Sequence, residues 1–320
     1  MDSLNSVESK NLPDIDIIMP ILNSESYLEK SLKSIRKQEY SGNLNVVVID
    51  GGSTDRSREI AEKYGCLVYV HKGMYMNGVN GAYNFGIKHT NSDFIFRMDS
   101  DNFLCGPNFF SKIIKPMLED HSIHLSVSVE VLSPGASCYD HYSLQKGIKM
   151  LFKNISGGKI NDEYYVVDDL SYGLTNCVLF RRNVYEQVGA FVSDISFLRA
   201  LRTKKLSKAA IVIDANFTSL LLGSYSSLLK KMYKRHKIVY LNLGDYNLMN
   251  LPSGEEYEED QLSLISYVKN LFLTLYNFVK SRDRVYFCGL LLETMPLMLL
   301  LIRPLSSILI YFRYIWKLGH

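Results

Sequence analysis

Three short, largely apolar runs in the first hundred residues predict strands of a single sheet. They cover residues 15–20, 44–49 and 93–96, and Pro20 is expected to end the first strand. Continuous apolar runs of this length are typical of parallel strands that are buried on both faces. Between the first two runs, apolar residues recur at helical spacing from Ser26 onward. The alternation predicts an α/β fold, with a mostly parallel central sheet flanked by helices.

Two carboxylates, Asp99 and Asp101, follow the third run as Asp-Ser-Asp. Alternate side chains of a strand point to opposite faces, so a strand that breaks at Asp99 lets both carboxylates converge at its carboxyl edge. Ligands bind at this edge in open α/β sheets. Two close carboxylates repel each other unless a cation lies between them, and a divalent cation held with substrate phosphates is the usual arrangement. The alternative is a surface turn, which Asp and Ser also favour.

The second run ends in Asp50-Gly51-Gly52-Ser53. The two glycines permit a tight turn and a close approach of the backbone to a ligand. Ser53 is a candidate N-cap for the helix that follows. An acid at the end of a strand, then glycines, then the start of a helix, is the layout of a nucleotide site. The G-x-G-x-x-G fingerprint of dinucleotide-binding domains is absent.

These motifs, in their order along the chain, resemble family 2 glycosyltransferases of the GT-A fold. The resemblance extends from about Pro13 to about Ile238. It rests on Pro-x-x-Asn at 20–23, Asp-Gly-Gly-Ser-Thr-Asp at 50–55, Gly-Ala-x-Asn-x-Gly at 81–86, Asp-Ser-Asp at 99–101 and Phe-Arg-Arg through Val-Gly-Ala-Phe at 180–191.

The resemblance implies a nucleotide-diphosphate sugar as donor and a divalent cation, Mg²⁺ or Mn²⁺, as cofactor. Asp50 would bind the base or the ribose. Asp99 would contact ribose or diphosphate and share the metal with Asp101, which would bind it directly. The residues expected along the donor are Pro20, Asn23, Glu25, Asp50, Gly52, Ser53, Gly81, Asn84, Asp99 and Ser100.

Three positions depart from the family's pattern. Gly51 replaces a frequent second acid. Tyr83 replaces the Arg of the usual Ala-Arg-Asn, which removes a diphosphate contact. Asn102 replaces a frequent third Asp, so the metal would have fewer protein ligands.

An inverting transfer to a hydroxyl needs a general base opposite the leaving diphosphate. In the family this base is often an Asp shortly after the Gly-Gly-Phe segment, a position that Asp194 occupies here. The alternative role for Asp194 is that of a helix N-cap. Asp168 and Asp169 are rival candidates, although an Asp pair before a strand is typical of a solvated turn.

Composition indicates a globular enzyme of the cytoplasm. Hydrophobic residues make up 47% and charged residues 22% of the 320 residues, which argues against disorder. A net charge of +3 does not favour nucleic-acid binding. The five cysteines are scattered, as reduced thiols usually are. The polar segment 1–12 does not resemble a secretory signal.

The last part of the chain predicts membrane association. Residues 228–237 are basic and amphipathic, and Arg235 and His236 stand where related polysaccharide enzymes carry residues near the acceptor. The alternative for this stretch is an ordinary solvated helix face. Apolar runs at 285–302 and 305–316 predict a helical hairpin in or on the bilayer, with helix packing or homo-oligomer formation as the alternative. The expected organisation is a polar tail at 1–12, a GT-A domain at 13–245 and a membrane-associated helical region at 246–320.

The sequence thus predicts a metal-dependent inverting glycosyltransferase at the cytoplasmic face of the cell membrane. Its acceptor would be a saccharide or a lipid-linked saccharide. A polyprenyl-phosphate sugar synthase is the alternative within the class, and its ionised acceptor would need no base. A non-catalytic scaffold that binds nucleotide at the membrane is the alternative from another class.

Overall fold

The computed structural model describes residues 11–72, 78–151, 155, 159–160, 163–170, 177–220 and 275. The chain divides into two units, of which the larger comprises Met1–Ser133 and Lys146–Leu220. The smaller unit comprises Pro134–Gln145 and Leu221–His320. The sheet and the candidate site belong to the larger unit. The predicted boundary at residue 245 and the predicted tail lie outside the described residues, apart from Leu275.

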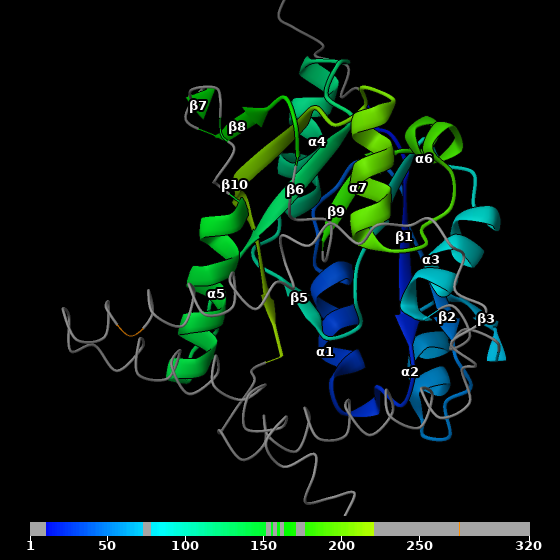
Figure 1. Ribbon diagram of the computed structural model, residues 1–320. Coiled ribbons are helices and arrows are strands. Elements are labelled where there is room, and N and C mark those ends of the chain that lie inside the picture. Colours follow the sequence, from blue (N-terminus) through cyan, green and yellow to red (C-terminus); the bar gives the residue numbers. More distant parts are fainter. Residues whose placement is uncertain are drawn as a thin grey trace, which may run out of the picture. The chain divides into compact units, whose positions relative to one another are not determined.

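The described strands form one mixed sheet (Figure 1) with the order β3-β2-β1-β4-β9-β6-β10-β8-β7, and β5 pairs with β10. Strands β3, β2, β1 and β4 are mutually parallel, as predicted. Beyond β4 most pairs are antiparallel, so the parallel character expected of the whole sheet holds for its first part. The strands are β1 (Ile15–Ile21), β2 (Leu44–Asp50), β3 (Leu67–Val70), β4 (Phe94–Arg97), β5 (Asn102–Leu104), β6 (Leu125–Glu130), β7 (Lys159–Ile160), β8 (Tyr164–Val167), β9 (Val178–Arg181) and β10 (Ala209–Ser219).

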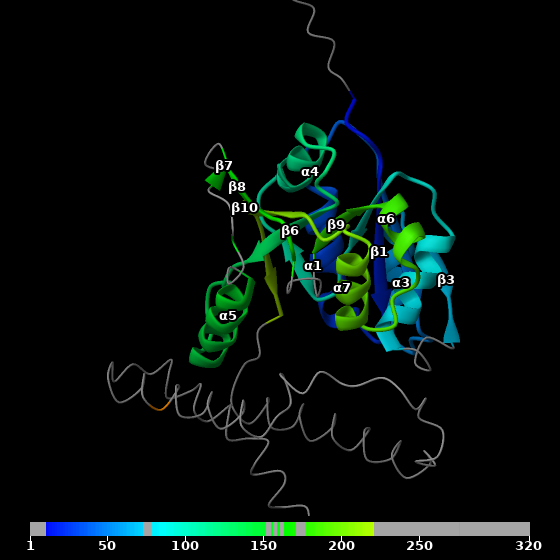
Figure 2. The same cartoon turned by 45° about the horizontal axis from the view of Figure 1, so that its top comes forward.

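Helices cover both faces of the sheet. Helices α1 and α4 pack on the face to which Ile17 points, and α3, α6 and α7 pack on the face to which Ile18 points. Figure 2 shows α3 and α7 close together on this second face. The helices are α1 (Glu25–Arg36), α2 (Ser57–Lys63), α3 (Gly78–Lys88), α4 (Phe109–Glu119), α5 (Cys138–Leu151), α6 (Arg182–Val188) and α7 (Asp194–Thr203).

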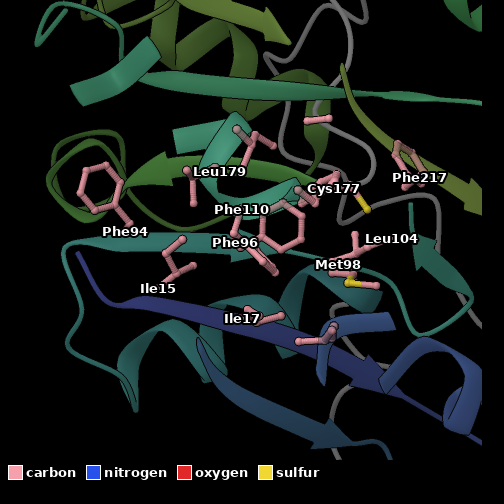
Figure 3. Close-up of a cluster of buried hydrophobic side chains, with 14 of the residues drawn as sticks. Ile15, Ile17, Phe94, Phe96, Met98, Leu104, Phe110, Cys177, Leu179 and Phe217 are labelled. Atoms are coloured by element: carbon pink, nitrogen blue, oxygen red, sulfur yellow. The ribbon is translucent and has the colours of Figure 1, made fainter. Parts of the chain in front are cut away.

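Aromatic side chains fill the core beneath α4. Figure 3 shows Phe96 of β4 beside Phe110 of α4, with ring centroids 5.1 Å apart in an edge-to-face arrangement. Phe109 meets the same strand residue at 5.6 Å. Such pairs add about 0.5–1.5 kcal/mol each beyond the burial of their area. β4, which leads into the Asp-Ser-Asp motif, is therefore closely packed on one face.

Pro20 does not end β1, which continues to Ile21. The N–H of Met98 donates to the carbonyl of Ile18, so the backbone polar groups of residues 18 and 20 point toward β4. Pairing between β1 and β4 stops at Ile18 and Arg97. The missing N–H of Pro20 therefore interrupts no ladder bond, which explains why a proline is tolerated inside this strand.

The described residues bear on two further expectations. Cys66, Cys105 and Cys177 are free thiols, as predicted, and Cys177 is buried. Within the described ranges, no helix combines the length and the apolar character needed to cross a bilayer.

Candidate functional site

The carboxyl ends of β1, β2 and β4 meet at one edge of the sheet, because these strands are parallel. The loops that hold Asn23, Asp50 and Asp99 follow these three strands. The hydroxyls of Ser24 and Ser100, which come from the first and third loops, lie 3.2 Å apart. The structure thus brings together the motifs that the sequence places far apart.

Asp50 organises the loop that follows β2. Its side chain is fully buried, and Oδ1 accepts hydrogen bonds from the Ser53 N–H at 2.8 Å, the Ser53 hydroxyl at 2.5 Å and the Gly52 N–H at 3.2 Å. Nε of Arg58 lies 3.1 Å from Oδ2, as an ion pair without hydrogen-bond alignment. Gly52 has a φ of +102°, which favours glycine at this turn. A direct contact between Asp50 and a nucleotide stays a prediction.

Ser53 is not the N-cap of the next helix. α2 begins at Ser57, and its first turn is held by Asp55, whose Oδ1 accepts from the Ser57 N–H at 3.0 Å. Ser53 instead joins two loops, because its hydroxyl also accepts from the Asn23 N–H at 3.0 Å. The loop after β2 is long enough that Ser53 lies one turn too early to cap α2.

Asn23 and Glu25 lock the first loop onto the second. Asn23 has a φ of +49°, and its side-chain carbonyl accepts from the Thr54 N–H at 2.9 Å. Glu25 accepts from Nε of Arg56 at 2.7 Å and from the N–H of the same residue at 3.1 Å. These hydrogen bonds lower the pKa of Glu25. Both side chains thus have protein partners, and their predicted proximity to the nucleotide remains a prediction.

Asn84 has protein partners at both ends of its side-chain amide, and its predicted contact with the donor stays a prediction. Its Oδ1 accepts from the Phe191 N–H at 2.8 Å and from the Tyr185 hydroxyl at 3.0 Å, while its Nδ2 donates to the Phe191 carbonyl at 2.8 Å. Both ends of the amide therefore fix the loop between α6 and α7. Gly81 lies in α3, one turn from the start of this helix.

Asp99 is tied to the residue that replaces the family's arginine. The Tyr83 hydroxyl donates to Oδ1 of Asp99 at 2.5 Å, and the tyrosine is only 1% exposed. Burial raises the pKa of Asp99; the Tyr83 hydrogen bond and Arg97 oppose the rise, and Asp101 adds to it. The charged form of Asp99 is therefore disfavoured unless a positive group compensates for the neighbouring Asp101.

The chemistry of this pair fits a hard divalent cation. Carboxylate oxygens are the ligands that Mg²⁺ and Mn²⁺ prefer, and a cation would offset the repulsion between Asp99 and Asp101. Among the described residues, no cluster of three or more His, Cys, Asp or Glu could hold a metal by itself. A cation here would need the oxygens of a bound diphosphate or of water, which is the usual arrangement for Mg²⁺.

Asn102 acts as a brace of the motif. Its Oδ1 accepts from the Asp99 N–H at 3.3 Å, and its Nδ2 donates to the Ser219 hydroxyl at 3.1 Å. Asn102 is fully buried. An amide is suited to this position because it donates at one end and accepts at the other, which a carboxylate cannot do.

Sequence reasoning missed Arg97, the last residue of β4. It is 4% exposed, and its Nη1 donates to Oδ1 of Asp194 at 2.7 Å while its Nη2 donates to Oδ1 of Asn80 at 3.2 Å. Its guanidinium lies over the Tyr83 ring at 4.3 Å from the centroid. The signal was present in the sequence, since a single arginine between Phe96 and Met98 interrupts an apolar run.

Asp194 stands at the start of α7 but is not its N-cap. Ser193 is the cap, and its hydroxyl accepts from the Ser196 N–H at 3.1 Å. The N-cap alternative for Asp194 is therefore wrong. The Asp194 side chain is 30% exposed, so the carboxylate is reachable from solvent while it is paired with Arg97.

The rival acids lie at the other end of α7. Asp169 forms an exposed ion pair of 2.8 Å with Arg202, in the last turn of the helix. Arg202 is eight positions beyond Asp194 along the helix, about 12 Å at 1.5 Å per residue. The backbone carbonyl of Asp168 accepts from the Ser207 hydroxyl at 3.2 Å. These placements favour Asp194 as the acid nearer to the Asp-Ser-Asp motif.

Arg235 and His236 lie outside the described residues. A groove of about 900 Å³ runs along α1 and β5 and includes Glu25, Lys30, Lys33 and Phe103, but neither Asp50 nor Asp99. The groove therefore adjoins the carboxylate edge at Glu25 and does not include Asp50 or Asp99.

Comparison with known proteins places these motifs in a family. The family described as "Glycosyl transferase family 2" matches residues 16–189, which is more than half of the chain. The glycosyltransferase GlyA of Streptococcus pneumoniae serotype 4 is 27% identical over 239 residues, covering 72% of this chain and 30% of that protein. An uncharacterized glycosyltransferase of Haemophilus influenzae is 33% identical over 119 residues, covering 35% of this chain and 46% of that protein. The matches thus span less than half the length of these relatives.

One relative aligns over most of its own length. The processive diacylglycerol beta-glycosyltransferase of Mycoplasma pneumoniae is 21% identical over 280 residues, covering 85% of this chain and 71% of that protein. Among solved structures, TarS 1–349 of S. aureus in complex with UDP has a TM-score of 0.49 and 17% identity, over 83% of this chain and 72% of that one. The mannosyltransferase PcManGT of Pyrobaculum calidifontis has a TM-score of 0.47 and 16% identity, over 74% and 68%.

Proposed function

The chain belongs to glycosyl transferase family 2, and we propose that it transfers a sugar from a nucleotide-diphosphate donor to a hydroxyl of a saccharide or lipid-linked saccharide. The observation that carries this proposal is the meeting of three loops, with Asn23, Asp50 and Asp99, at one edge of a parallel sheet. In open α/β sheets this edge is where a nucleotide binds.

The donor side of the reaction rests on the loop of Asp50 and on the Asp-Ser-Asp motif. Asp50 holds its loop in one conformation through hydrogen bonds to Gly52 and Ser53, so little entropy is lost when a nucleotide binds there. Asp99 and Asp101 would hold a divalent cation together with the diphosphate. When bound, this cation neutralises charge that develops on the leaving diphosphate.

The acceptor side rests on Asp194. In an inverting transfer, the acceptor oxygen forms a bond to the anomeric carbon while the bond from this carbon to the diphosphate breaks. The acceptor proton must leave at the same time, and a carboxylate within hydrogen-bond reach accepts it. Asp194 is partly exposed, which suits this role. It is linked to Asp99 because it pairs with Arg97, which stacks on Tyr83, and the Tyr83 hydroxyl donates to Asp99.

The names of the relatives support a glycosyl-transfer reaction, and one of them adds a lipid to the candidate acceptors. GlyA and the H. influenzae protein are both named glycosyltransferases. The M. pneumoniae relative, which this chain matches over most of its length, is named for transfer to diacylglycerol. A lipid or a lipid-linked saccharide would also suit the apolar carboxyl-terminal runs at 285–302 and 305–316.

A donor screen tests the proposal. Purified full-length protein with MnCl₂ is incubated with UDP- and GDP-sugars, with and without lipid and saccharide acceptors, and release of nucleoside diphosphate is followed. We expect release with one donor class that is stimulated by an acceptor. Binding of nucleotide without release by any donor would favour the scaffold alternative. Release that needs only a polyprenyl phosphate would favour the synthase alternative.

We further propose that the protein works at the cytoplasmic face of the membrane. This proposal rests only on the amino-acid sequence of residues 228–320. Five basic residues at 230–237 suit an anionic leaflet, with about 1 kcal/mol per charge near the surface. Washing membranes with salt and then with carbonate distinguishes surface attachment from insertion. Full-length protein that is wholly in the supernatant without detergent would contradict the proposal and favour an oligomer formed by the carboxyl-terminal helices.

A further inference from the structure

We propose that Arg97 is a positioning residue, which holds the carboxylate of Asp194 in place and, through Tyr83, fixes it relative to Asp99. The inference rests on the proposed function and deepens it. It makes the donor side and the acceptor side of the site one connected unit.

The connection is continuous and consists of short contacts. Oδ1 of Asp194 accepts from Nη1 of Arg97 at 2.7 Å. The same guanidinium lies 4.3 Å above the ring of Tyr83, and the hydroxyl of this ring donates to Asp99 at 2.5 Å. The ring centroid of Phe191, from the loop before α7, lies 5.2 Å from the Cζ of Arg97. A shift of Asp99 or of Asp194 must therefore disturb a packed intermediate residue.

The surroundings of Arg97 argue against a purely structural role. Its neighbour on the same face of β4, Ile95, is buried in the apolar cluster beneath α3, α6 and α7. Apolar residues in place of the whole Arg97–Asp194 pair would extend this cluster without desolvating a charge, and replacement of a complete ion pair in this way is often neutral or stabilising. Moreover, Nε of Arg97 is buried and donates to no atom of the described residues. An unsatisfied donor of this kind costs stability and calls for another explanation.

The charges around Tyr83 supply a second argument. The guanidinium of Arg97, at the end of β4, stacks on the ring of Tyr83, and the hydroxyl of this tyrosine donates to Asp99. The pair Tyr83 and Arg97 thus places a cation between the two acidic groups, Asp99 and Asp194, which would otherwise repel each other.

A kinetic double-mutant cycle tests this role in the full-length protein, with Arg97→Gln, Asp194→Asn and the double variant. We expect Arg97→Gln to lower kcat by about 10²-fold, since small displacements of a catalytic group cost this much. KM for the donor and the affinity for nucleoside diphosphate should change little, because donor contacts remain. In the Asp194→Asn background, the same Arg97→Gln change should cost no more than about threefold, since residues that act as a unit are not additive. Arg97→Lys, which restores the charge, should recover part of kcat.

Arg182→Gln is the matched control. Arg182 is also a largely buried arginine in an ion pair, with Asp16 at 3.0 Å, but Asp16 lies near the amino end of β1, away from the site. Its loss should lower the melting temperature and leave the kcat of the folded protein unchanged. Melting curves of all variants separate folding defects from kinetic ones.

Three outcomes decide the matter. Effects of Arg97→Gln and Asp194→Asn that add fully would overturn the positioning role while leaving the proposed function intact. A fall in melting temperature with unchanged kcat for Arg97→Gln would do the same and would make the arginine structural. Absence of turnover by the wild-type protein on any donor would overturn the proposed function and the inference with it. This result differs from the first two because activity is then already missing before any residue is changed.

Discussion

A β-carbon on Gly86 would lie 2.4 Å from Cγ2 of Ile18, closer than real side chains approach. Gly86 belongs to α3 and Ile18 to β1, so the glycine permits the close packing of this helix on the sheet. The same helix carries Tyr83, whose hydroxyl meets Asp99. The last glycine of the Gly-Ala-x-Asn-x-Gly motif therefore acts on the site by setting the depth of α3.

Gly86→Ala should consequently destabilise the fold. Overpacking of a well-filled core costs about 1–3 kcal/mol, and part of it should appear as a lower melting temperature. Gly147→Ala in α5 is the matched control, since in the described residues nothing beyond the neighbouring residues and the backbone of its own helix lies within 4 Å of the added β-carbon. This second change should stabilise by about 0.5–1 kcal/mol through helix propensity. Equal melting temperatures for the two variants would contradict the close packing.

Asp101→Ala should abolish most turnover, because the diphosphate charge is then left without its counter-ion. Loss of such stabilisation is worth several kcal/mol. Excess EDTA should reproduce the effect in the wild type, and added Mn²⁺ should reverse it. The matched control is Asp214→Ala, which removes an exposed carboxylate from β10. Full activity in EDTA would exclude the proposed metal.

Asp50→Asn should weaken the binding of nucleoside diphosphate by about tenfold or more, which corresponds to about 1.4 kcal/mol. The amide presents a donor where Asp50 now accepts from Ser53 and Gly52, and Arg58 loses its ion pair. Isothermal calorimetry measures the change, and circular dichroism verifies the fold. Unchanged affinity in a folded variant would make Asp50 a residue of the turn alone.

Asp194→Asn keeps the size of the side chain and removes its ability to accept a proton. Loss of a general base typically lowers the rate by about 10²–10⁴-fold. Donor affinity should stay at the wild-type value, because Asp194 is expected to face the acceptor. If the variant retains a near-normal rate, either the base is another residue or the acceptor is already ionised, as in a polyprenyl-phosphate synthase.

Asp120 should contribute a pH-dependent part of the stability. The Ser122 hydroxyl and Lys208 hold the pKa of Asp120 far below its ordinary value of 3.8. A lowered pKa in the folded state stabilises the protein above the unfolded pKa, and this stability is lost as the pH falls below about 4. Asp120→Asn should therefore flatten the decrease of the melting temperature at acid pH. Lys208→Met, which removes the partner at 2.9 Å, should have the same sign. A profile identical to the wild type in both variants would contradict the linkage.

The elements and the position of the site were predictable because they depend on local patterns. Buried parallel strands are apolar over their whole length, so residues 15–20 and 44–49 identified β1 and β2 nearly to the residue. Strands that run in parallel place their carboxyl ends together, which located Asp50 and Asp99 at one edge. The errors at Pro20 and Ser53 concern boundaries, where a few residues of loop length decide which side chain meets which N–H.

The sequence by itself determined the α/β core, the family and the acids that gather at the sheet edge, since each follows from residue type and spacing along the chain. Only the tertiary structure decided what these residues touch. Arg97 and Asp194 are 97 positions apart, and Asn84 binds Phe191 across 107 positions. No local pattern encodes such a pairing, because it depends on how α3, β4 and α7 pack against one another. The role of Arg97 emerges from this packing, as a buried cation held between two acids by the ring of Tyr83.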